Sequence, residues 1–297
     1  MNKRCPTLRI HHPRMGALVF REAVSIFFHM PYAHREIARQ VRQSLETYLH
    51  WVGPNTLTCY PDEHGYFQEL DATGWEVIQH QLRDEGGGIV ELDETPDEVS
   101  GYRFEYRGIN PRDNATPFSG CTVAFWLPTE YLEEKGPGPV RELALTLGHI
   151  LPFNSGHAGY SFNYIAPPPG FAELALRHPG IDHLRLNGLP EHLGHQVRSP
   201  HWLTFLGPPV LGELGGTEGL STRLRTPGTT VQAMGHERAV VSLGEWPEAG
   251  DTTKGDTLPA YRELARVLEP WLYHRPYFGR DPREEAELRR WERRFLD

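Results

Sequence analysis

Residues 118–164 decide the fold, and they read FSGCTVAFWLPTEYLEEKGPGPVRELALTLGHILPFNSGHAGYSFNY. β-branched and aromatic residues fill 121–127, which predicts a strand that stops at Pro128. Thr129 follows at the position of a helix N-cap. The strand is therefore expected to lead directly into a helix.

The second part of this stretch predicts another helix and another strand. Residues 136–139, GPGP, interrupt the first helix, and apolar side chains then recur at helical spacing from Val140 to Ile150. Gly156 and Gly159 predict a turn, and the aromatic residues at 160–164 predict a strand after it. Nothing in the stretch matches a catalytic motif, so it is expected to act as scaffold.

In the rest of the chain, the periodicity of apolar residues and the Gly or Pro residues that interrupt it predict the other elements. Strands are expected at 17–28, 101–108, 202–206, 229–234 and 239–243. Helices are expected at 32–52, 73–82, 171–177, 209–214, 257–273 and within 281–297. The set predicts an α+β fold with a mostly antiparallel sheet and helices packed on it.

The helical segments VRELALTL at 140–147 and YRELARVL at 261–268 are alike. They hint at two related strand-helix-strand-strand-helix halves, although eight aligned residues do not establish a duplication. We expect one α+β domain over 1–297, with 1–178 and 200–297 as the alternative division.

Composition narrows the protein classes. The formal net charge is −9, which argues against broad nucleic-acid binding because such proteins cluster Lys and Arg against phosphates. The only cysteines, Cys5, Cys59 and Cys121, are too scattered for a disulfide framework. Charged residues interrupt the N-terminal apolar run, so neither a signal peptide nor a membrane span is expected. We therefore expect a cytoplasmic protein that does not enter a membrane.

Histidines give the one local pattern that suits a metal: His183, His192, His195 and His201. Against this interpretation, Gly194 and Pro200 break a rigid helical ligand pair, and no H-E-x-x-H motif is present. Polar loop histidines explain the pattern better. His157, between Gly156 and Gly159, is expected to be a structural residue in a turn.

Other chemical candidates are weaker. Cys121 lies in an apolar strand, which predicts an inert core thiol. The glycine-rich GELGGTEG at 212–219 fails both the dinucleotide and the Walker patterns. Tryptophans lie in apolar-periodic segments where burial is the ordinary outcome. We therefore expect no catalytic residue, no metal and no cofactor.

Carboxylates form two groups in Gly- and Pro-bearing segments. The members of the first, within residues 84–98, are expected to face no Lys or Arg and so to form an uncompensated acidic segment, and the second surrounds the single Lys254. The interpretations of a solvated loop and of a docking surface both remain open. As candidate partner-binding residues we take Asp84, Glu85, Glu91, Asp93, Glu94, Asp97, Glu98, Glu245, Glu248 and Asp251.

An ordered series of segments resembles a known family. The series is WLPTEYLEEKGPGPVRELAL from 126, LPFNSGHAGYSFN from 151, PHWLTFLGPPVLGELGG from 200, LRTPGTTVQ from 224, ERAVVSLGEWPEAGD from 237 and LPAYRELARVLEPWL from 258. It is similar to the type VI immunity family and covers nearly the whole chain. The resemblance implies a non-enzymatic immunity protein that binds and neutralises a cognate antibacterial effector toxin, often a nuclease, and it supplies no catalytic residues.

The acidic balance agrees with that resemblance, because a nuclease presents a basic cleft that an acidic inhibitor can occupy. The expected partner is therefore a toxin with a basic surface. Two alternatives stay open at this point. One is a metal-dependent hydrolase that uses the histidines between His183 and His201, and the other is an adaptor or chaperone that loads an effector onto a secretion machine.

Overall fold

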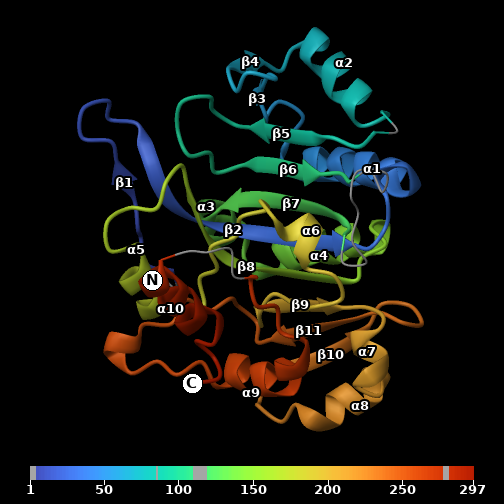
Figure 1. Cartoon of the computed structure of the whole chain (residues 1–297), viewed down its shortest axis with the longest axis vertical. Coiled ribbons are helices and arrows are strands. Elements are labelled where there is room, and N and C mark those ends of the chain that lie inside the picture. The colour runs from blue at the N-terminus through green and yellow to red at the C-terminus, as the bar shows by residue number, and fades with distance from the viewer. Residues whose placement is uncertain (1–4, 85, 110–118, 277–280) are drawn as a thin grey trace.

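A computed structural model describes residues 5–84, 86–109, 119–276 and 281–297 of the chain (Figure 1). The strands are β1 (Ile10–His11), β2 (Leu18–Met30), β3 (Cys59–Pro61), β4 (Phe67–Glu69), β5 (Ile89–Asp93), β6 (Arg103–Arg107), β7 (Cys121–Pro128), β8 (Ser155–Tyr164), β9 (Leu203–Leu206), β10 (Thr229–Ala233) and β11 (Ala239–Leu243). The α-helices are α1 (His34–Val52), α2 (Ala72–Gln81), α3 (Thr129–Lys135), α4 (Pro137–Ile150), α5 (Phe171–Arg177), α6 (Leu189–His192), α7 (Val210–Glu213), α8 (Gly216–Arg223), α9 (Pro259–Leu268) and α10 (Pro282–Glu292). Two 3₁₀ turns, η1 (Thr252–Lys254) and η2 (Glu269–Trp271), complete the described elements.

All the named strands belong to one sheet. Its order is β10-β11-β9-β8-β2-β7-β6-β5-β3-β4, and β1 pairs with β2 beside this path. Each ladder between these strands is antiparallel. The expected α+β fold with an antiparallel sheet is confirmed.

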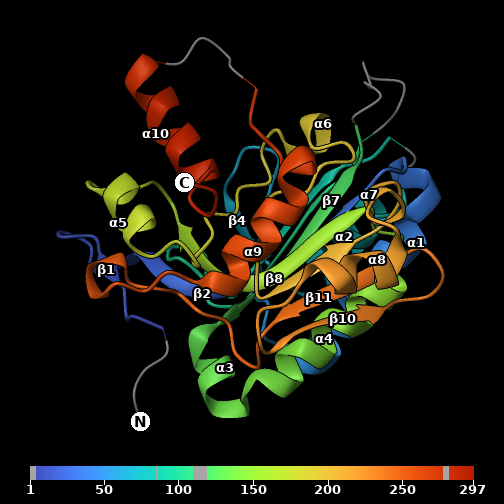
Figure 2. The same ribbon diagram turned by 90° about the horizontal axis from the view of Figure 1, so that it is seen from below.

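Strand β2 lies near the middle of the sheet and is buried on both faces. Val24, Ile26 and Phe28 belong to the main core together with the apolar faces of α1 and α4. Ala23 and Phe27 point to the opposite face, where they pack on apolar side chains of residues 184–193. The period of two along a strand produces this division. Figure 2 shows helices on both sides of the sheet, with α3 and α4 on one side and α9 and α10 on the other.

Two parts of the sheet share a strand order. The first trio lies side by side as β6-β7-β2, and its strands occur along the chain in the order β2, β6, β7. The second trio lies side by side as β10-β11-β9, and its strands occur along the chain in the order β9, β10, β11. The last strand of each trio therefore lies between the other two. Helix α4 follows β7 and helix α9 follows β11, so the two RELA segments occupy matching places. A common origin of the two halves stays a prediction.

Local expectations for the two glycines, for His157 and for Thr129 were wrong. Gly156 and Gly159 lie inside β8 and form no turn, and His157 is therefore a strand residue. A Cβ at Gly156 would meet the Phe27 carbonyl oxygen at 2.6 Å, so the glycine permits close approach of β2. Thr129 is the first residue of α3 and not its N-cap.

The long helix expected at 257–273 is divided in the structure. It consists of α9, which ends at Leu268, and the 3₁₀ turn η2, which contains Pro270. Proline lacks the N–H that a continuing α-helix would need, which accounts for the change. Among the described helices, none has the length and apolar composition needed to cross a membrane.

One end of the sheet extends beyond the shared strand order. Strands β5, β3 and β4 continue the sheet past β6, and α2 packs against β5 (Figure 1). The β3–β4 hairpin is short, and all three residues of β4 are exposed. This end therefore presents an edge strand and its connecting loops to solvent.

Candidate functional site

The acidic residues of β5 are paired with arginines of the neighbouring strand, β6. Arg107 Nη2 donates to Glu91 Oε1 at 2.6 Å, and Arg103 Nη2 donates to Glu91 Oε2 at 3.0 Å. Asp93 Oδ1 lies 3.5 Å from Arg103 Nε. Strand β5 pairs with β6 in a register that places Asp93 opposite Arg103. The expectation that this segment faces no Lys or Arg is therefore wrong for Glu91 and Asp93.

Two further acidic residues of the segment hold local backbone. Glu94 Oε2 accepts from the N–H groups of Gly101 and Tyr102 at 3.0 and 3.2 Å. Asp84 is exposed, and its Oδ1 accepts from the N–H of Gly86 at 2.9 Å. Glu85 lies outside the described residues. These contacts stabilise turns, so Glu94 in particular has a role in the fold.

A different set of residues faces solvent at the β3–β4 end. Glu69, Asp97 and Glu98 are exposed, and within the described ranges their carboxylates make no hydrogen bond or ion pair. Tyr66 and Phe67 lie in the same region with 71% and 42% of their surface exposed. We name these five residues the acidic-aromatic end. It combines charge that the fold does not use with two large exposed rings.

Two hollows flank Phe67. The larger, about 470 Å³, is lined by Phe67, Glu69 and Pro96 together with apolar side chains that include Trp75. The smaller, about 270 Å³, is also lined by Phe67 and Pro96, and it reaches Glu98. Phe67 and Pro96 therefore stand between two recesses, which is a shape that can receive side chains of another protein.

The second acidic group is divided between structural and exposed residues. Arg177 donates to both oxygens of Asp251, from Nε at 3.0 Å and from Nη2 at 2.8 Å. These hydrogen bonds lower the pKa of Asp251. Glu245 and Glu248 are exposed. Asp251 therefore ties its loop to α5, whereas the two glutamates are accessible.

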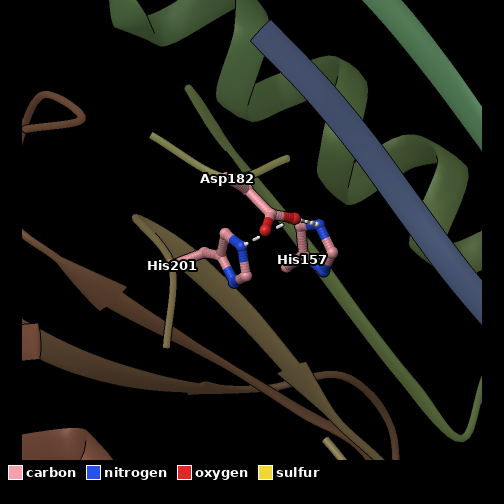
Figure 3. A group of neighbouring side chains, drawn as sticks. All are labelled: His157, Asp182 and His201. Atoms are coloured by element: carbon pink, nitrogen blue, oxygen red, sulfur yellow. Dashed lines mark ion pairs between the residues drawn. The ribbon is translucent and has the colours of Figure 1, made fainter. Parts of the chain in front are cut away.

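The polar cluster richest in chemical groups is buried in the core (Figure 3). His157 of β8 and His201 before β9 each place Nε2 3.4 Å from Asp182 Oδ2. Arg198 Nη2 lies 3.1 Å from both oxygens of Asp182. Asp182 has no exposed surface. Burial is the largest single influence and opposes ionisation, but the Arg198 charge and the two imidazoles together outweigh it and hold the pKa of Asp182 well below its usual value.

His157, Asp182 and His201 lie close enough to be considered as metal ligands. The orientation of the rings argues against it. The two imidazoles are stacked, with centroids 3.7 Å apart and planes inclined by 10°. A metal ion lies in the plane of each imidazole that binds it, and two stacked planes do not converge on one point. Arg198 already neutralises the carboxylate. The cluster is therefore suited to holding the core together.

The histidines proposed from the sequence are dispersed. His195 is exposed and contacts Asn154. The ring of His183 instead packs against Trp291, with the two ring centroids 3.8 Å apart. His192 is half-buried on α6. In the part of the chain that the structure describes, only His201 of these four belongs to a group close enough to share a metal ion. Its neighbours, His157 and Asp182, were missed because three distant segments bring them together.

The remaining sequence candidates occupy structural positions. Cys121 is fully buried in β7, and burial raises the pKa of its thiol. Trp126 and Trp202 are buried, so they form no exposed platform. The glycine-rich segment at 212–219 runs from α7 into α8. The positions of Cys121, Trp126 and Trp202 agree with the expectation of core packing, whereas the glycine-rich segment is partly exposed and separates two helices.

Comparison with known proteins decides the family. A family model described as TsiV, type VI immunity for VRR-NUC, matches residues 38–295. The chain belongs to the TsiV family. A comparison with curated proteins gave no match. Since TsiV is a type VI immunity family, this TsiV chain is an immunity protein that neutralises a cognate effector toxin.

A solved structure shares the fold. The Pseudomonas aeruginosa T6SS protein PA0821 aligns with a TM-score of 0.82 over 97% of this chain and 87% of that chain, at 16% sequence identity. At this identity the likeness establishes the fold.

Proposed function

We propose that this TsiV protein neutralises a nuclease effector by direct contact, and that the acidic-aromatic end covers the effector's nucleic-acid-binding surface. The observation that carries the proposal is the set of carboxylates of Glu69, Asp97 and Glu98, which have no partner among the described residues, at the same end as two exposed aromatic rings. The fold uses the carboxylates of Glu91, Asp93 and Glu94, so those residues are removed from the docking set.

Charge explains how such a surface inhibits. A nuclease holds phosphates with basic side chains, and an acidic protein surface is attracted to the same groups. Complementary charge accelerates association, and the aromatic rings supply the desolvated contact area that charge alone lacks. A stable pair buries roughly 1,600 Å² in total, so the contact extends beyond these five residues.

The proposal includes no catalytic step by the immunity protein. The cluster of His157, Asp182 and His201 is inaccessible to a substrate because each of its side chains is buried. Occupying the nuclease's substrate surface is sufficient for neutralisation. Because the target of such an effector is nucleic acid inside the cell, we place the interaction in the cytoplasm.

The test uses the cognate VRR-NUC effector with an inactivating substitution for binding and the active enzyme for inhibition. We expect the wild-type immunity protein to bind, to stop DNA cleavage, and to bind more weakly at about 300 mM than at about 50 mM NaCl. The double variant Asp97→Lys/Glu98→Lys should weaken binding at low salt by about tenfold or more.

The matched control is Glu245→Lys/Glu248→Lys, which makes the same charge change in the other acidic loop. This control should bind as the wild type does. Equal losses in both variants would show that net charge alone acts, and the proposed surface would be wrong. Binding without any loss of nuclease activity would instead indicate an adaptor, as would failure to protect cells that lack the secretion system.

A further inference from the structure

The larger hollow of the acidic-aromatic end has two chemically different sides. Its apolar side contains Leu57, Leu70 and Trp75, and Phe67 stands at its margin. Leu57 and Leu70 are buried in the core, so this wall is fixed by packing. Glu69 and Gln68 of β4 also line the hollow, and Glu69 is the one charged residue among the described residues that line it. The hollow can therefore receive a side chain that is apolar along its length and polar at its tip.

Glu69 carries the charge of this hollow and has no structural duty for its carboxylate. The side chain is exposed, and across the described ranges it has no ion pair or hydrogen bond. The backbone of Glu69 is fixed by its pairing with Cys59 in the β3–β4 hairpin. The hairpin thus fixes the backbone of a residue that lines the hollow together with Phe67 and Trp75, and its carboxylate is unpaired among the described residues.

Building on the proposed function, we infer that this hollow receives an arginine side chain of the nuclease effector, stacked on Phe67 or Trp75 and paired with Glu69. The methylene stem of arginine can lie along the apolar wall while its guanidinium reaches the carboxylate. A planar guanidinium also stacks on aromatic faces and pairs with a carboxylate through two hydrogen bonds.

Other side chains fit less well. A purely apolar anchor would cover Glu69 and leave a desolvated carboxylate without a partner, which is strongly unfavourable. Lysine is more strongly hydrated and lacks the planar fork, so it gains less from the aromatic wall. Covalent capture is also disfavoured, because burial raises the pKa of the Cys59 thiol in the same wall to about 11.

The experiment measures dissociation constants for the inactivated effector with Glu69→Gln, Phe67→Ala and the control Glu76→Gln. Glu76 is an exposed glutamate of α2, next to Trp75 in sequence, and it does not line the hollow. We expect Glu69→Gln and Phe67→Ala each to raise the dissociation constant by about tenfold or more. Glu76→Gln should stay within about twofold of the wild type, and thermal unfolding should be unchanged for all three variants.

The partner side chain is then found by replacing the effector's surface arginines with lysine one at a time. One replacement should reproduce the loss, and combining it with Glu69→Gln should cost less than the two separate losses together. If wild type binds but Glu69→Gln and Phe67→Ala bind equally well, the arginine hollow is wrong and the proposed function stands. If losses occur without any coupled arginine, the occupant is another group. Failure of wild type to bind would instead remove the proposed function, and this inference with it.

Discussion

The buried Asp182 cluster and the acidic-aromatic end use carboxylates in opposite ways. Asp182 has no exposed surface and is contacted by Arg198 and by two imidazoles. Glu69 and Glu98 are exposed and unpaired in the parts of the chain described. The cluster that looks most like an active site therefore serves the fold, whereas the plain surface carboxylates are available to a partner.

The comparison also separates residues within a single acidic segment. Glu91 is hydrogen-bonded to both Arg103 and Arg107. In contrast, Asp97 and Glu98, only a few positions later in the chain, are exposed. Strand pairing satisfies the first, and a loop leaves the others exposed. Net charge alone does not identify a docking surface, because part of that charge is consumed by the fold.

The largest expected effect comes from breaking the buried cluster. Asp182→Ala should lower the free energy of unfolding by about 3–5 kcal/mol, because it leaves the Arg198 guanidinium, whose side chain is only 8% exposed, without its partner. Urea denaturation monitored by tryptophan fluorescence measures this loss. Asp97→Ala is the matched control and should change stability by less than about 0.5 kcal/mol. Similar values for the two variants would abolish the distinction between the regions.

Acid should lower the free energy of unfolding through the buried histidines of the core. Burial lowers the pKa of His29 and of His157 to about 3, from an ordinary value near 6.5. The unfolded chain therefore binds more protons as the pH falls from about 6.5 towards 3. The stability that the two neutral imidazoles contribute is therefore complete above about pH 6.5 and is lost as the pH falls from about 6.5 towards 3.

For these two histidines we expect the free energy of unfolding to fall by about 2.5 kcal/mol between pH 7 and pH 5.5. Urea denaturation at several pH values measures the slope. His29→Leu should reduce it, and Glu98→Gln should leave it unchanged. A flat profile over this interval would contradict the neutral state of the buried imidazoles.

The smallest effect on stability should accompany a clear effect on binding. Asp97→Asn/Glu98→Gln removes two exposed charges and should shift the free energy of unfolding by no more than about 0.5 kcal/mol. Effector binding should become weaker and less dependent on salt. Paired measurements of unfolding and of the dissociation constant test this. A large loss of stability would place these carboxylates in the fold with Asp182.

Much of the architecture was predictable from the sequence. The strand at 121–127, the interruption at 136–139 and the helix at 171–177 follow from local propensity and punctuation, and the structure has all three. The candidate site was harder to predict from the sequence. Glu91 and Asp93 depend on the β5–β6 register, and the contact between His157 and Asp182 joins separate segments. Gly156 looked like a turn because the close approach of β2 is a tertiary contact.

The shared strand order has a consequence for how such a protein changes its target. Strands β3, β4 and β5 lie outside both β6-β7-β2 and β10-β11-β9, at one extremity of the sheet. Substitutions at exposed positions such as Tyr66 or Asp97 therefore leave the two trios and their covering helices intact. On the proposed function, recognition of a new effector can evolve at that extremity while the rest of the molecule stays the same, and the proposed binding surface can then change independently of the scaffold.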